Sequence, residues 1–260
     1  VMMGRKAKLS IADMKAIHLD VYMSSSIAVR NAVVKRLDAL GVADRLSPQA
    51  RQVLSLMRAW DGHYRAADRG PVAFELLYYN LSKQVIEAKV GKEYAQAYGG
   101  FARIRRMLIE DFAATDDQNA SAMLLRAFEN AGKRLGSFAT WGDMHRFTLS
   151  HPLAFAPVIG DRYRFGDFPA AGSSESLMKT AHAATDHRHI TRYGQQARHL
   201  TDMADLDRNW FLLLGGQDGW LSSTTAFDQA ALWRRGGYIK MPMRLETVKR
   251  AAYRTMKLTR

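Results

Sequence analysis

Residues 191–242 read TRYGQQARHLTDMADLDRNWFLLLGGQDGWLSSTTAFDQAALWRRGGYIKMP, and this stretch decides the fold. Its hydropathy pattern predicts an extended segment over 195–203 and a second, more apolar extended segment over 209–214. The polar run 204–208 between them is typical of a tight corner. The stretch therefore predicts two neighbouring strands that pair in the manner of a hairpin.

A glycine-rich turn and a helix are predicted to follow this pair. Gly215, Gly216 and Gly219 favour a turn, because glycine enters backbone conformations that other residues avoid. Thr225 stands three residues before Asp228 and so approximates a capping box, which predicts that a helix carrying Trp233 begins near Thr225. The Trp and Met residues of this region, including Trp210 and Trp220, are predicted to lie in the core.

Many residues of this stretch, in order and at matching spacing, resemble the carboxy-terminal end of the penicillin amidase family of N-terminal-nucleophile hydrolases. The matching residues are Arg198-His-Leu-Thr-Asp202-Met-Ala-Asp205-Leu-Asp207, Gly216-Gln217-Asp218-Gly219, Ser222-Ser223, Asp228-Gln229, Trp233, Gly237-Tyr238 and Met241-Pro242. Further matches lie upstream at Asp20-Val21, Trp60-Asp61-Gly62, Trp141 with His145, and His151-Pro152-Leu153. The resemblance covers only the back half of the family's large subunit.

Composition narrows the class of protein. No run of about 18 apolar residues occurs, so a membrane span is not expected, and the amino terminus lacks the apolar segment of a signal peptide. The chain has no cysteine, which removes disulfides and thiolate chemistry. Its formal charge of +13 suits an anionic partner, but Lys and Arg are dispersed and do not alternate with stacking aromatics. Nucleic-acid binding is therefore not the favoured interpretation.

The order of predicted elements indicates an α+β fold. Residues 1–138 read as mostly helical, and residues 139–260 read as late strands with closing helices. Predicted helices start at Ser10 and Ser47-Pro48, span Ile27–Leu40 and Tyr94–Phe112, begin at Gly70-Pro71 and Asp116-Asp117, and include an ambiguous tail over Val248–Tyr253. Predicted strands span Trp141–Leu149 and Ser176–Ala181, a loop covers Ala183–His189, and Tyr253–Leu258 is a further possible strand.

The resemblance implies an αββα sandwich in which antiparallel sheets lie between helical layers. It also implies amide hydrolysis by acyl transfer to a serine that self-cleavage leaves at the amino terminus of the large subunit, with that serine's own amine as base. That serine, a histidine and an oxyanion-hole asparagine would all precede this chain. The implied partners are the remaining large subunit and a small subunit. The implied substrate is an amide with an apolar or aromatic acyl group, such as a β-lactam side chain or an acyl-homoserine lactone.

Three further properties are implied by the family resemblance alone. Family members are commonly periplasmic or secreted. They need no organic cofactor, and some bind a structural calcium whose ligands are not identifiable in this chain. One site residue carries over: Asp202 matches the carboxylate, usually Glu, that orients the catalytic histidine in cephalosporin acylases of the family. The alternative is that Asp202 bonds backbone or an arginine and is purely structural.

Other polar residues favour structural roles. Asp205 and Asp207 fit a turn better than a calcium site, because their spacing lacks the EF-hand ligand series. His187 and His189 offer two metal ligands at most and are typical of a solvated loop. His145 is predicted to be a packed or hydrogen-bonded strand residue, and His151 to form a structural corner with Pro152. The hydroxyls of 172–176 lack a Gly-x-Ser-x-Gly elbow, and the turn 215–219 lacks the Lys-Ser/Thr ending of a phosphate loop.

Two other classes of function stay open from sequence. The first is a non-catalytic binding or structural module derived from the family, which would close its apolar faces on itself. The second is a basic nucleic-acid-binding protein, which would bind DNA with a steep salt dependence. A piece of a larger amidase would instead leave apolar surface and strand edges exposed.

Overall fold

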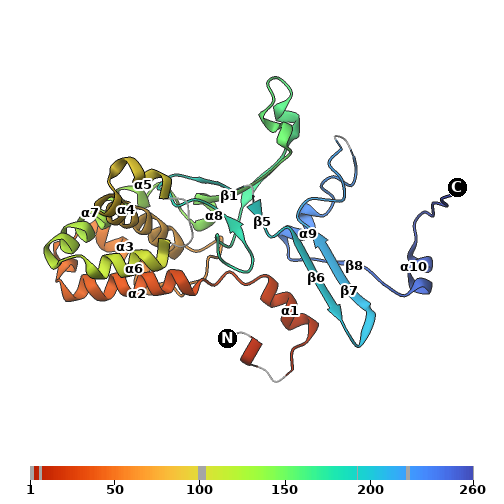
Figure 1. The fold of residues 1–260 in the computed structure, drawn as a ribbon, viewed down its shortest axis with the longest axis horizontal. Helices are drawn as coiled ribbons and strands as arrows, with labels where there is room; N and C mark the ends of the chain where they lie inside the picture. Colours follow the sequence, from red (N-terminus) through yellow and green to blue (C-terminus); the bar gives the residue numbers. More distant parts are fainter. Residues whose placement is uncertain (1–2, 6–7, 99–103, 192, 221–222, 260) are drawn as a thin grey trace. The chain divides into compact units, whose positions relative to one another are not determined.

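The computed structural model describes residues 3–5, 8–98, 104–191, 193–220 and 223–259 (Figure 1). The chain divides into a small unit, formed by Val1–Leu19 and Gln195–Arg260, and a large unit, formed by Asp20–Gly194. The boundary predicted between residues 138 and 139 lies inside the large unit.

The large unit is built around helix α4 (Gly70–Val90), which is buried on nearly all sides of its first four turns. A helix that is apolar all round is stable only inside a core, and α4 meets this condition by packing against α3, α5, α6 and α7. The other helices of this unit are α2 (Ser24–Ala39), α3 (Pro48–Ala59), α5 (Lys92–Tyr98), α6 (Ile104–Ala114), α7 (Asp117–Leu135) and α8 (Trp141–Met144).

The helix N-caps predicted from the sequence are confirmed at several helices. Ser47 accepts a hydrogen bond from the backbone of Ala50 and precedes a proline at the first position of α3. Asp116 caps α7 in the same way through Asn119. The helix predicted over Tyr94–Phe112 is helical wherever it is described, as α5 up to Tyr98 and as α6 from Ile104; the predicted residues 99–103 lie outside the described residues.

Three strands of the large unit form one sheet in the order β2-β1-β4. Strand β1 (His145–Ser150) pairs antiparallel with β2 (Arg164–Pro169) and parallel with β4 (His189–Thr191). The parallel pair differs from the all-antiparallel expectation, and it places His145 opposite His189. A second, two-stranded sheet pairs β3 (Thr180–Ala181) with β5 (Tyr193–Gly194).

Two strand predictions in this region were too long. Residues 141–144 form α8, because Thr140 caps a helical turn by accepting a hydrogen bond from the backbone of Asp143. Residues 176–179 lie outside β3, because the Ser176 hydroxyl accepts from Ser173 N at 2.9 Å and so holds a turn. The predicted loop over Ala183–His189 ends where His189 begins β4.

The small unit contains a sheet in the order β6-β7-β8. The predicted pairing is confirmed: β6 (Ala197–Asp202) and β7 (Asp205–Leu213) pair antiparallel with Leu200 opposite Trp210. The corner predicted over 204–208 is too long, because β7 already begins at Asp205, which pairs with Asp202. The long arrows of this hairpin are visible in Figure 1. The remaining elements are η1 (Met3–Arg5), α1 (Ile11–His18), α9 (Ala230–Arg234), β8 (Ile239–Lys240) and α10 (Leu245–Ala251). Helix α1 has the predicted capping box, with reciprocal hydrogen bonds between Ser10 and Asp13.

Three predictions for the small unit need correction. The helix expected from Thr225 begins only at Ala230, since the Thr225 hydroxyl donates to Asp218 and does not cap a helix. Trp220 and Met203 were predicted to be core, but they are 80% and 82% exposed. The tail is helical over α10, and the described part of the following segment contains no strand.

The glycine turn after β7 is held against the segment before α9. Gln217 N donates to Thr225 O at 2.8 Å, and Gln229 N donates to Gly215 O at 3.0 Å. A Cβ on Gly216 would lie 1.8 Å from Thr225 O, whereas one on Gly215 would meet only ordinary contacts, the nearest at 3.4 Å. Close backbone approach therefore requires glycine at position 216 and not at 215.

We expect Gly216→Ala to destabilise the turn by about 1–3 kcal/mol, because the backbone of residues 225–226 must move to admit the methyl group. Gly215→Ala is the matched control and should change stability by less than about 1 kcal/mol. Thermal unfolding followed by circular dichroism measures both. Equal effects of the two substitutions would contradict the close approach at Gly216.

Among the described residues, no helix combines the length and apolarity needed to cross a lipid bilayer.

Candidate functional site

Asp202, the predicted orienting carboxylate, lies at the end of β6. Its Oδ1 accepts a hydrogen bond from Ala204 N at 3.0 Å, and its Oδ2 pairs with Arg208 Nη1 at 2.9 Å. Both oxygens thus have partners at the hairpin corner. A role toward a histidine from outside the chain stays a prediction.

Asp205 and Asp207 hold the tail of the small unit against the same corner. Asp205 accepts from Asp207 N, as expected of an aspartate in a turn, and pairs with Arg244. Asp207 accepts from the backbone of Met243 and Arg244 and from the Thr247 hydroxyl. These bonds, led by that from Thr247, lower the pKa of Asp207 to about 2. The geometry is that of a carboxylate anchoring the start of α10.

The turn at 215–219 holds its own acidic residue. Asp218 accepts from Trp220 N at 2.9 Å and from the hydroxyls of Ser223 and Thr225. These hydrogen bonds, with Thr225 first, lower the pKa of Asp218. In the described part of the turn, the donor groups therefore bind the carboxylate of Asp218. They are not available to bind an external phosphate.

Three histidines of the large unit meet in its interior. His145 begins β1, His189 begins β4, and His182 follows β3 directly. The Nδ1 atoms of His145 and His189 are 3.2 Å apart, and the rings of His182 and His189 stack with centroids at 4.2 Å. We call these three residues the histidine cluster. His145 and His189 are buried, and His182 is partly buried.

Neighbouring hydroxyl and carbonyl groups fix the proton positions on two of the rings. The Thr180 hydroxyl donates to Ala171 O at 2.8 Å, so it must accept from His145 Nε2, which lies 2.9 Å away. His182 Nδ1 lies 3.1 Å from Ala183 O, which can only accept, and the Ser173 hydroxyl is then the donor to His182 Nε2 at 2.9 Å. The lone pair of His145 Nδ1 thereby faces the cluster, whereas that of His182 Nε2 accepts the hydrogen bond from Ser173.

The cluster is neutral at physiological pH. Burial, reinforced by the neighbouring His182 and His189, lowers the pKa of His145 well below its ordinary value. Burial is also the main reason that the pKa of His182 falls to about 4 and that of His189 to about 3. Uncharged imidazoles can hold a proton at a fixed atom or ligate a metal ion.

Trp141, from α8, covers the cluster. Its ring stacks on His145 at 4.6 Å and meets Tyr64 edge-on at 5.1 Å. Its Nε1 donates to Gly172 O at 3.0 Å. Gly172 has a φ of +90°, and a Cβ there would lie 2.1 Å from Met178 O, so this position requires glycine.

We expect Trp141→Phe to destabilise the chain by about 1–3 kcal/mol. Phenylalanine keeps an aromatic ring over His145 but leaves the buried Gly172 carbonyl without this donor. Denaturant unfolding measures the change. An unaltered midpoint would show that the indole hydrogen bond contributes nothing.

A buried ion pair lies beside the histidine cluster. Glu75 of α4 is 1% exposed, and its Oε1 accepts from the Tyr64 hydroxyl at 2.6 Å and from Arg105 Nη2 at 3.2 Å. Arg105 of α6 also pairs with Glu175 at 3.2 Å and lies over the Tyr78 ring. Burial, with the charge of Glu75 next, raises the pKa of Tyr64 well above its ordinary value. Tyr64, Glu75 and Arg105 are buried in this network, whereas Glu175 is exposed and joins it to the surface.

Ser173 is the one hydroxyl of the 172–176 run that approaches an imidazole, that of His182. It is fully buried, and His182 Nδ1 faces the Ala183 carbonyl where a catalytic pair would have a carboxylate. That no internal serine is a nucleophile stays a prediction. His151 lies apart from the cluster and accepts from Leu153 N at 3.1 Å, in a structural corner.

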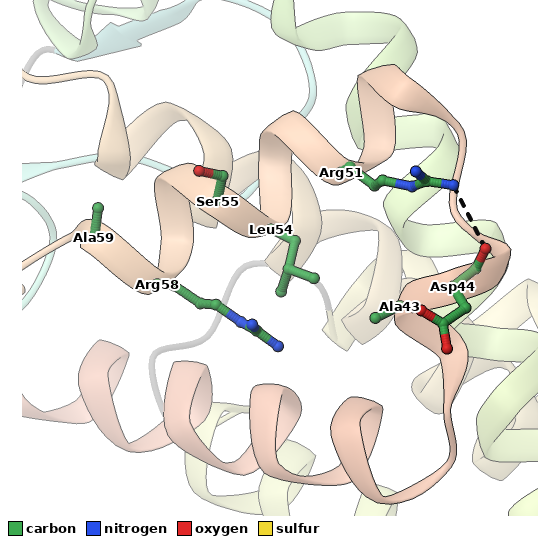
Figure 2. Close-up of a pocket in the computed structure, with 7 residues that line it drawn as sticks. All are labelled: Ala43, Asp44, Arg51, Leu54, Ser55, Arg58 and Ala59. Carbon is green, nitrogen blue, oxygen red and sulfur yellow. Dashed lines mark hydrogen bonds between the residues drawn. The ribbon is translucent and has the colours of Figure 1, made fainter.

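A surface pocket lies away from these groups, over α3 and η2 (Val42–Arg45) (Figure 2). Its two arginines have partners in the chain: Arg51 donates to Leu46 O and Asp44 O, and Arg58 pairs with Asp38. Both arginines are engaged by these contacts within the chain, so we assign no function to the pocket.

Sequence reasoning missed the histidine cluster. It placed His187 and His189 together in a solvated loop, and only His187 is exposed, while His189 begins a buried strand. His182 was not singled out at all. The alternation of His189, Ile190 and Thr191 was the available signal, since alternate residues of a strand face one side.

Comparison with known proteins identifies first the fold class of the chain and then its family. The folded chain is similar to the thermostable penicillin G acylase from Alcaligenes faecalis, with a TM-score of 0.56, at 16% identity, and the match covers 98% of this chain and 50% of that one. This likeness establishes the mixed helix-and-sheet fold. The family model of penicillin amidase matches residues 1–250. The chain belongs to the penicillin amidase family, which confirms the resemblance drawn from the residues between Arg198 and Pro242.

The chain spans about half the length of the acylase chain that it matches. No curated protein matches it.

Proposed function

We propose that the chain is part of an amidohydrolase that hydrolyses C–N amide bonds by acyl transfer to an N-terminal serine lying outside residues 1–260. The observation that carries this proposal is family membership over residues 1–250, joined to a structural match that spans only half of a penicillin G acylase chain. The serine's own α-amine would serve as base, and backbone N–H groups with an asparagine would stabilise the oxyanion. No organic cofactor enters this chemistry.

Exposed apolar side chains support a partner for this chain. The segment between β1 and β2 presents Phe155 at 70% exposure and Val158 at 102%. In the small unit, Met203 and Trp220 are 82% and 80% exposed. Such surface in a soluble protein commonly marks an interface. We propose that the rest of a large subunit and a small subunit cover it.

The proposed substrate is an amide whose acyl group is apolar or aromatic, such as a β-lactam side chain, an acyl-homoserine lactone or an acylated peptide. The proposed location is the periplasm or the exterior of the cell, where such substrates are met. Both proposals rest on family membership.

The test is to express the complete reading frame that contains this chain and to assay a panel of chromogenic amides with phenylacetyl, aliphatic and β-lactam-derived acyl groups. The proposal expects a polypeptide cleaved to begin with serine and turnover of at least one class. A correctly folded product that lacks such a serine and leaves the whole panel intact would indicate a non-catalytic module of the family.

Asp202 gives a sharper prediction within that active enzyme. If its carboxylate orients the catalytic histidine, Asp202→Asn lowers kcat by roughly 10–100-fold, the equivalent of one hydrogen bond to a charged group. Asp205→Asn is the matched control, because Asp205 lies at the same corner and pairs with Arg244. Equal and small effects of the two substitutions would assign Asp202 a structural role.

A further inference from the structure

We propose that the histidine cluster, His145, His182 and His189, binds one divalent transition-metal ion of the zinc type. The site would tie β1, β4 and the residue after β3 together inside the large unit. This inference goes beyond amide hydrolysis and does not depend on it.

The spacing of the ring nitrogens suits such an ion. One nitrogen from each of the three rings lies within 4.8 Å of the others. Zinc binds imidazole nitrogen at about 2.0–2.1 Å in tetrahedral geometry, which places two ligand nitrogens about 3.3–3.4 Å apart. The 3.2 Å separation of the Nδ1 atoms of His145 and His189 approximates one edge of that tetrahedron.

The surroundings prepare the rings as ligands. Thr180 holds the proton of His145 on Nε2, which leaves the Nδ1 lone pair for an ion. The Ala183 carbonyl holds the proton of His182 on Nδ1, so its Nε2 lone pair can bind an ion once the Ser173 hydroxyl releases it. Metal-bound histidines typically have their second nitrogen held in this way. The chain therefore supplies both the ligands and the groups that orient them.

His189 provides an independent observation. It is 3% exposed, and its Nε2 has no hydrogen-bond partner among the described residues. The short Nδ1–Nδ1 contact requires a proton on His189 Nδ1, because His145 Nδ1 has none. An ion between the two rings would replace that proton, which would move to Nε2 and leave His189 neutral.

Loading requires one ring to turn. The His182 and His189 rings are inclined by only 11°, so their lone pairs lie in nearly parallel planes and do not meet at one point. Rotation about χ2 of histidine crosses broad minima. The Ser173 hydroxyl would at the same time release His182 Nε2 to the ion.

The charge of the ion would be partly offset by Glu75. Its Oε2 is buried and lacks a hydrogen-bond partner among the described residues, and its charge acts to raise the pKa of His189. Arg105 opposes this effect at His182. Arg105 also pairs with Glu175, which is exposed, so it is shared between two carboxylates. Glu75 can therefore offset part of the charge of a buried dication.

The experiment is to titrate the full chain with Zn²⁺ against a chromophoric chelator, and then to load it with Co²⁺. The proposal expects one ion per chain, the visible bands of tetrahedral Co²⁺, and exchangeable hyperfine-shifted N–H resonances from three imidazoles. His189→Ala should weaken Zn²⁺ binding by about 100-fold or more, beyond the roughly 10–100-fold typical when a group that hydrogen-bonds a metal ligand is removed.

His187→Ala is the matched control, because His187 lies two residues away and is exposed. It should bind Zn²⁺ as the unaltered chain does. Thr180→Val leaves all three rings in place and should weaken binding by roughly 10–100-fold through loss of the hydrogen bond to His145. The resonance count is made on the unaltered chain and needs no variant to fold.

Absence of a bound ion in the unaltered chain would overturn the proposal. So would equal binding by His189→Ala, or loss of binding in His187→Ala alone, since either would place the ion at the surface. Amidase activity is not the readout, so the proposed function stands or falls separately.

Discussion

Replacing Glu75 by alanine is expected to destabilise the large unit by about 3–5 kcal/mol, the range found when one partner of a buried ion pair is removed. The change would leave Arg105, which is 6% exposed, with only the partly exposed Glu175 as its counter-charge. It would also take the acceptor from the Tyr64 hydroxyl. Urea unfolding measures the loss, and a change below about 1 kcal/mol would contradict the account of this pair.

The matched control lies on α6, the helix that carries Arg105. Arg106 pairs with Glu110 at 2.9 Å, but both side chains are exposed. Glu110→Ala should therefore change stability by about 0–0.5 kcal/mol. The double variant Glu75→Leu with Arg105→Met should recover much of the loss, since well-packed apolar residues can replace a buried pair. Failure of the double variant to recover would show that the pair also determines packing.

The free energy of unfolding of the metal-free chain is expected to fall as the pH is lowered from about 6.5 to about 4. In the folded chain, burial lowers the pKa of His182 to about 4 and that of His189 to about 3, whereas an unfolded histidine titrates near 6.5. Below pH 6.5 the unfolded chain therefore binds more protons than the folded chain, and the free energy of unfolding falls. For a single histidine with a folded pKa of about 4, the loss at pH 4 is roughly 3 kcal/mol.

The measurement is urea unfolding in the presence of EDTA across this range of pH. Carboxyl groups with a lowered pKa, such as Asp207 at about 2, change the free energy of unfolding only below about pH 4. The change above that pH therefore comes from the histidines. His189→Gln should reduce the slope by about 1.4 kcal/mol per pH unit, the value for one proton. A slope unchanged by His189→Gln, or reduced equally by His187→Gln, would contradict burial of a neutral cluster.

Local chemistry allowed much of the fold to be predicted. Ser10, Ser47 and Asp116 each precede a helix and bond its first turn, because a short polar side chain at that place satisfies a free N–H. The hairpin β6–β7 could be predicted for a similar reason, because a polar corner separates two segments of extended pattern. The family followed from spaced matches over the same stretch and is confirmed over residues 1–250.

Features that depend on contacts distant in sequence were not predictable. Thr225 has the sequence of a helix cap, yet its hydroxyl binds Asp218 across the turn, and α9 starts later. Trp220 follows the glycine turn and is exposed, which hydrophobicity alone does not reveal. The histidine cluster depends on the parallel pairing that sets His145 opposite His189. No spacing in the sequence encodes that pairing.

The central claim is that this chain belongs to an amidohydrolase whose nucleophile is a serine outside residues 1–260. The most direct measurement is to treat the active whole enzyme with a serine-reactive sulfonyl fluoride and to locate the adduct by mass spectrometry. The account predicts loss of activity with a single adduct on an N-terminal serine beyond this chain. An adduct on a serine within residues 1–260, such as Ser173, would contradict it.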